Sequence, residues 1–186
     1  MTVYFIRHWK VENNKNRVVN GSEDDQNLSE EWLQELETKS FVENMKSLDI
    51  DIIYTSALKR WIQTWTKINQ IIEKDIPLVY DQLLNEQSLW EFAGRAHDDI
   101  TRENNLTKEE LSKFYRTQNK KWESWEQFVS RVKSFFDYIK DVDENILVVS
   151  HGWVYRAYLY HYCDYWLDES LAKKYQLENL EFIRIF

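Results

Sequence analysis

Cysteine, proline and glycine are scarce in this sequence of 186 residues, which holds one cysteine, one proline and three glycines. The single cysteine, Cys163, excludes an intramolecular disulfide and a metal cluster built from cysteines, and it fits a reducing cytoplasm. We interpret Cys163 as a small buried apolar residue rather than as a nucleophile. With so few glycines, each is expected to meet a particular requirement of the backbone.

A long hydrophobic run is also missing. No apolar stretch approaches the roughly 20 residues that cross a membrane, and the first six residues lack the basic region and cleavage site of a signal peptide. We therefore expect a cytoplasmic protein without a membrane partner, whose first residues form a core strand.

Basic residues are outnumbered, with 24 Lys and Arg against 32 Asp and Glu, which gives a formal net charge of −8. Nucleic-acid binding normally requires a basic face, so we expect no nucleic-acid partner. The same charge repels anionic substrates at long range, and a phosphate site must therefore be built from local cations.

The residues that are present alternate between short apolar runs and segments of helical period. Five runs are interpreted as strands: 2–7, 50–55, 76–80, 145–150 and 180–185. Apolar residues recur every three or four positions over 57–73 and 125–140, which predicts two long helices. Strands that alternate with helices indicate a mostly parallel sheet covered on both faces, a three-layer α/β/α sandwich.

Helix starts can also be predicted. Ser124 and Gln127 form a capping box that opens the second long helix, and Thr107 with Glu110 opens a shorter one. Ser29 is the expected N-cap of a helix that carries Leu33, Leu36, Phe41, Met45 and Leu48. Residues 94–124 are polar and weakly patterned. We interpret them as a helical insertion over the sheet's edge within a single domain that spans 1–186.

Charged and polar residues directly follow three of the predicted strands. Arg7-His8 ends the first, the segment 55–60 with Arg60 follows the second, and Ser150-His151-Gly152 ends the fourth. Each piece alone has a plainer explanation as a turn or a solvated side chain. Ligands bind beyond the carboxyl ends of the strands in open parallel sheets, so the joint occurrence predicts one site. Two guanidinium groups suit a doubly charged phosphoryl group, and a neutral histidine can attack phosphorus.

With these residues in place, the sequence resembles the histidine phosphatase superfamily, the phosphoglycerate-mutase-like family, over nearly its whole length. The segments that carry the resemblance occur in the family's order and are Arg7-His8-Trp9, Asn14, Leu28-Ser29-Glu30, Thr55 to Thr64, Leu84-Asn85-Glu86, Trp90 to Arg95, Glu123-Ser124 with Arg131, Val148 to Arg156, and Asn179.

The resemblance implies roles for particular residues. His8 is the nucleophile that becomes phosphorylated, and Arg7, Arg60 and His151 surround the phosphoryl oxygens. Asn14 adds a hydrogen bond to phosphate. Glu86 matches the general acid that protonates the leaving alkoxide and later activates water. The expected activity is hydrolysis of a small phosphorylated substrate without a metal or other cofactor; a homodimer is compatible with this sequence.

Several positions depart from the family pattern. Tryptophan stands at usual glycine positions, and Ala57 replaces a proline. Packing in the core or at the rim is the favoured interpretation of these tryptophans, although Trp9 and Trp153 could narrow the pocket. His97 and His161 have no partner at metal-ligand spacing and are not expected to bind a metal.

Three other functions stay open. A phosphoglycerate-type mutase would use the same residues, although family mutases have a longer insertion after the general-acid segment. A non-catalytic protein that binds phosphorylated ligands would be favoured if Trp9 and Trp153 filled the pocket. A protein phosphohistidine phosphatase would be favoured by an open, shallow site.

Overall fold

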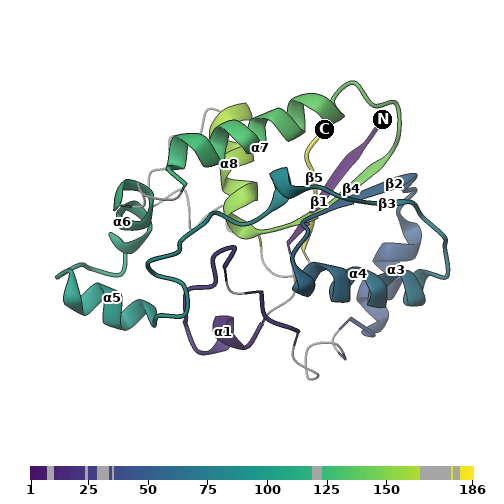
Figure 1. Ribbon diagram of the computed structural model, residues 1–186. Coiled ribbons are helices and arrows are strands. Elements are labelled where there is room, and N and C mark those ends of the chain that lie inside the picture. Colours follow the sequence, from purple (N-terminus) through teal and green to yellow (C-terminus); the bar gives the residue numbers. More distant parts are fainter. Residues whose placement is uncertain are drawn as a thin grey trace.

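A five-stranded sheet forms the centre of the computed structural model, which describes residues 1–7, 11–23, 25–28, 34, 36–118, 123–163, 177 and 181–186 (Figure 1). The strands are β1 (Val3–Arg7), β2 (Ile52–Thr55), β3 (Leu78–Tyr80), β4 (Ile146–Ser150) and β5 (Phe182–Arg184). Their spatial order is β3-β2-β4-β1-β5. Neighbours from β3 to β1 run parallel, and β5 pairs antiparallel with β1, so the predicted mostly parallel sheet is confirmed.

Helices cover both faces of this sheet, as Figure 1 shows. One face carries α3 (Lys39–Ser47) and α4 (Lys59–Ile72), and the other carries α7 (Trp125–Ile139) and α8 (Gly152–Tyr162). Side chains alternate along the strands because successive residues of a strand point to opposite faces. Phe5 packs in the core beside α7 and α8, whereas the next residue, Ile6, packs in the core beside α3 and α4. The three-layer sandwich expected from the sequence is therefore present.

The helix starts agree only in part with the prediction. The capping box is formed, since Ser124 Oγ accepts from the Gln127 backbone N–H and Gln127 Oε1 accepts from the Ser124 N–H. The helix expected to run from Ser29 through Leu48 is not continuous. Its predicted start at Ser29 lies outside the described residues, as does Leu33, and α3 begins at Lys39. Thr38 is extended (φ −62°, ψ 137°) and serves as the N-cap, which interrupts the helix after the buried Leu36.

In the segment 94–124, which the sequence analysis interprets as an insertion, the described residues form two short helices, α5 (His97–Glu103) and α6 (Leu111–Gln118). Thr107 and Glu110 hydrogen-bond to each other reciprocally before α6, as expected of a capping box. A small core joins the insertion to the loops near the sheet's carboxyl end, and it comprises Val19, Leu89, Phe92, Ile100 and Tyr115, with the partly buried Trp153 against it.

Cys163 is exposed, which corrects the expectation of a buried residue, because it lies at the C-cap of α8. The edge strands β3 and β5 are each three residues long. None of the described helices is long and apolar enough to span a membrane.

Candidate active site

The carboxyl ends of three adjacent parallel strands meet at one edge of the sheet. Arg7 ends β1 and pairs in register with Ser150 at the end of β4, and Thr55 at the end of β2 pairs with Val149. The residues that follow these strands therefore converge. His151 comes directly after β4, and Arg60 lies in the first turn of α4, which follows β2.

His151 is fully buried and has polar neighbours around its ring. Ser56 Oγ lies 3.0 Å from Nε2, and Arg60 Nη2 lies 3.4 Å from Nδ1. The indole N–H of Trp61 also meets the ring, with Nε1 2.9 Å from Nε2 and 3.4 Å from Nδ1, and the two rings are nearly perpendicular at 83°. These contacts fix the orientation of the imidazole.

A chain of hydrogen bonds links His151 to Asn85. The Ala57 N–H donates to Asn85 Oδ1 over 3.0 Å, and the Ser56 hydroxyl donates to the same atom over 2.9 Å. Ser56 Oγ in turn lies 3.0 Å from His151 Nε2, and Nδ1 faces the Arg60 guanidinium. The same hydrogen bonds account for an alanine in place of the family's proline at position 57, because a proline would have no N–H to donate to Asn85.

Glu86 lies on the other side of the imidazole, with its Oε2 3.8 Å from His151 Nδ1. Burial raises the pKa of Glu86, although Arg60, the Gln87 N–H, Arg7 and Arg131 all act in the opposite direction. A raised pKa favours the protonated carboxyl, which is the form that donates a proton in general acid catalysis.

Two arginines supply the positive charge of the site. Arg60 is fully buried and donates to the Gly21 carbonyl over 3.3 Å, and Arg7 Nη1 donates to the Leu177 carbonyl over 3.0 Å. Gly152 allows Arg7 to lie where it does, because a Cβ on this residue would be 3.2 Å from Arg7 Nε. Local cations are thus present in a protein whose net charge is negative.

Arg156, the last residue of the segment Val148 to Arg156 that carries part of the family resemblance, adds a third arginine near this group, although it was not among the residues predicted for the site. Its guanidinium lies over the Trp153 ring, 4.8 Å from the centroid. Burial, Arg7 and Arg116 lower the pKa of Arg156 to about 10, against the opposite effect of Glu86. Trp153 in turn packs edge-on against Trp125, with ring centroids 5.8 Å apart. These contacts support the packing interpretation of Trp153.

His8, the predicted nucleophile, and its neighbour Trp9 lie outside the described residues. So do Ser29, Glu30 and Asn179, which belong to the segments that carry the family resemblance. Asn14 lies in α1 (Glu12–Lys15), and its role toward phosphate stays a prediction. Among the described side chains, no group of three or more His, Cys, Asp or Glu is placed to hold a metal ion.

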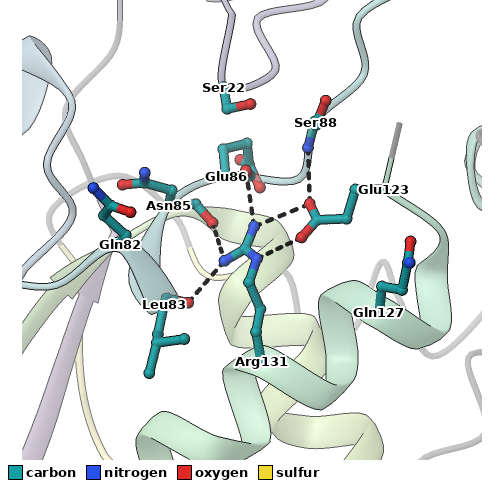
Figure 2. Close-up of a pocket in the computed structure, with 9 residues that line it drawn as sticks. All are labelled: Ser22, Gln82, Leu83, Asn85, Glu86, Ser88, Glu123, Gln127 and Arg131. Carbon is teal, nitrogen blue, oxygen red and sulfur yellow. Dashed lines mark hydrogen bonds and ion pairs between the residues drawn. The ribbon is translucent and has the colours of Figure 1, made fainter. Parts of the chain in front are cut away.

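A cavity of about 540 Å³ opens beside Glu86 (Figure 2). Its lining is mainly polar and consists of Ser22, Gln82, Leu83, Asn85, Glu86, Ser88, Glu123, Gln127 and Arg131. Figure 2 shows the Arg131 guanidinium between the 83–86 backbone and Glu123.

An α/β sandwich with arginines, a histidine and a buried glutamate beyond the carboxyl ends of its strands has the architecture of an enzyme that acts on phosphate groups. The chain belongs to the histidine phosphatase superfamily (branch 1), whose family model matches residues 3–185.

Individual proteins show the same relationship. A probable phosphatase of Schizosaccharomyces pombe is 32% identical over 94 residues, which cover 50% of this chain and 43% of that protein. Phosphoglycerate mutase from Bacillus anthracis, known from a crystal structure, has 25% sequence identity to this chain. The two structures superpose with a TM-score of 0.76 over 99% of this chain and 86% of the mutase chain. A putative alpha-ribazole-5'-P phosphatase from Escherichia coli, 20% identical, shares the fold with a TM-score of 0.73 over 100% of this chain and 90% of that one. The matched region covers less than half the length of the Schizosaccharomyces pombe protein.

Proposed function

We propose that this protein hydrolyses phosphate monoesters in two steps through a phosphohistidine on His8, without a metal ion. The observation that carries the proposal is the convergence of Arg7, Arg60, His151 and the buried Glu86 at the carboxyl ends of β1, β2 and β4. His8 directly follows Arg7 in the sequence, and the family resemblance assigns it the nucleophilic role.

In the first step a ring nitrogen of His8 attacks phosphorus, and the bond from phosphorus to the ester oxygen breaks. Glu86 gives its proton to the departing oxygen, so the alcohol leaves neutral and Glu86 becomes a carboxylate. Arg7 and Arg60 stabilise the charge on the phosphoryl oxygens in the transition state.

In the second step the Glu86 carboxylate takes a proton from water, and the water oxygen attacks phosphorus. The bond between phosphorus and His8 breaks, inorganic phosphate leaves, and both His8 and Glu86 return to their starting states. The arginines supply the positive charge throughout.

The test compares His8→Ala with His161→Ala, a matched change at an exposed histidine of α8. On 4-nitrophenyl phosphate and a panel of small esters and phosphopeptides, His8→Ala should abolish turnover, and His161→Ala should retain it. Native protein quenched during turnover with alkaline detergent should contain covalently bound phosphate that acid releases, and turnover should survive excess chelator. Near-native activity of His8→Ala would overturn the proposal, as would a loss on chelation that magnesium or zinc restores.

A mutase is the second candidate, and it is supported by the likeness to the Bacillus anthracis phosphoglycerate mutase. The same assays separate the two functions when 3-phosphoglycerate is the substrate. A hydrolase releases inorganic phosphate, whereas a mutase returns the phosphoryl group to the sugar acid and releases the 2-phospho isomer.

A further inference from the structure

Arg131 is a cation beside the active site whose hydrogen-bonding capacity is used entirely within the protein. A guanidinium has five N–H donors. In Arg131, Nη1 donates to the carbonyls of Leu83 and Asn85 at 2.8 Å each, Nη2 donates to the Glu86 carbonyl at 3.1 Å and to Glu123 Oε2 at 3.1 Å, and Nε donates to Glu123 Oε1 (Figure 2). No donor is left over for a substrate phosphate.

These bonds, together with one made by Glu123, hold the backbone before and after Glu86. Three of the acceptors are backbone carbonyls of residues 83 to 86, and Glu123, which Arg131 holds, also accepts from the Ser88 N–H over 3.0 Å. The segment that carries Glu86 is thus tied to α7 at both ends. A further tie runs to the end of β2, through Asn85 Oδ1 and the Ala57 N–H.

A general acid works only when its carboxyl lies within hydrogen-bonding reach of the leaving oxygen, and small displacements reduce the rate strongly. We propose that Arg131, held by Glu123, is a positioning residue that sets the place of the Glu86 carboxyl for proton transfer to the leaving group. This inference rests on the proposed function, in which Glu86 is the acid.

Geometry rather than charge is the contribution of Arg131. Its charge is already paired with Glu123, and its effect on the Glu86 carboxyl is the weakest of the four that oppose burial. Lysine keeps the charge, but its three donors sit on one nitrogen and cannot span these acceptors. Arg131→Lys therefore separates geometry from charge.

The experiment measures kcat/KM on two esters, because this ratio reports the steps up to release of the alcohol. The leaving group of glycerol 2-phosphate is a basic alkoxide that needs a proton, whereas the leaving group of 4-nitrophenyl phosphate is nitrophenolate, which departs without one. Arg131→Lys should lower kcat/KM on glycerol 2-phosphate about tenfold or more and on the nitrophenyl ester less than about threefold. Glu123→Gln, a milder change that keeps the packing, should show the same dependence on the leaving group. Arg95→Lys, a change at an exposed arginine paired with Glu103, should affect neither ester.

A double variant distinguishes the possible failures. In the Glu86→Gln background, Arg131→Lys should cost little further activity on glycerol 2-phosphate, because no acid remains to be positioned. If Glu86→Gln shows the leaving-group dependence but Arg131→Lys and Glu123→Gln lower both esters equally, the positioning role is wrong and the proposed function stands. If Glu86→Gln itself shows no leaving-group dependence, the assignment of the acid fails.

Discussion

Replacement of Trp61 by phenylalanine tests how His151 is held. Trp61 is fully buried on α4, and its indole N–H contacts the imidazole. Phenylalanine fills most of the same space but has no N–H. Trp65 lies one turn further along α4, is 4% exposed, and has no hydrogen-bond partner among the described residues, so Trp65→Phe is a matched control.

The expected losses follow from the structure. Each replacement removes roughly 40 Å³ of buried volume, which costs about 1 kcal/mol at the usual penalty for a residual cavity. Trp61→Phe also loses a hydrogen-bonding contact worth about 1 kcal/mol. We therefore expect Trp65→Phe to lower the free energy of unfolding by about 1 kcal/mol and Trp61→Phe by about 2 kcal/mol. For a chain of this length, the corresponding drops in Tm are about 2–4 °C and 4–8 °C.

Activity should separate the two variants further. If the contact worth about 1 kcal/mol orients His151 in the transition state, its loss lowers kcat/KM about fivefold, whereas Trp65→Phe leaves it unchanged. Thermal unfolding followed by circular dichroism, together with turnover of 4-nitrophenyl phosphate, measures both effects. Equal drops in Tm and unchanged kcat/KM in both variants would refute the role given to the indole N–H.

Three further predictions concern the rest of the site. Glu86→Gln should depress hydrolysis of glycerol 2-phosphate by about 10²-fold and affect phosphorylation by the nitrophenyl ester far less; if Glu91→Gln shows this pattern instead, the acid is Glu91. Because burial raises the pKa of Glu86 in the folded protein, folding is favoured below its ordinary pKa and loses that advantage as pH rises toward the folded value. Glu86→Gln does not titrate, so urea unfolding should show it gaining stability relative to the native protein between pH 4 and pH 7; the opposite trend would contradict a raised pKa. Ser150→Ala removes a buried hydrogen bond of 2.7 Å to the Leu84 carbonyl and should cost about 1–3 kcal/mol, whereas Ser134→Ala, at an exposed hydroxyl, should cost less than about 0.5 kcal/mol by the same measurement.

Local sequence patterns were sufficient to predict the layers of the fold. The segment Ile146–Ser150 is continuously apolar up to its last residue, and it forms the central strand, which is buried throughout. The capping box at Ser124 was visible because its two partners are three residues apart. Position after a strand also placed Arg7, Arg60 and His151 at one edge of the sheet, since parallel strands end together.

Contacts between distant segments could not be predicted in the same way. The hydrophobic period of α4 shows that Trp61 is buried, but not that its N–H meets a histidine 90 positions away. Arg131 lies within the predicted helix α7, but the sequence around it does not show that its guanidinium donates to backbone carbonyls 45 to 48 residues earlier. Thr38 could adopt either a helical or an extended backbone, and the spacing of the apolar residues on either side does not indicate that it is extended and ends the helical pattern there.

The two short outer strands have a consequence for the behaviour of the protein at high concentration. An exposed sheet edge is a row of unsatisfied backbone donors and acceptors, and long flat edges recruit strands from other molecules. Here β3 and β5 offer only three residues each, and β5 runs against the direction of the strand beside it. The continuously apolar β4, which would be the strongest template for intermolecular pairing, lies between β2 and β1. The strand order therefore keeps the segment most prone to aggregation at the middle of the sheet, where it is exposed only when the sheet itself opens.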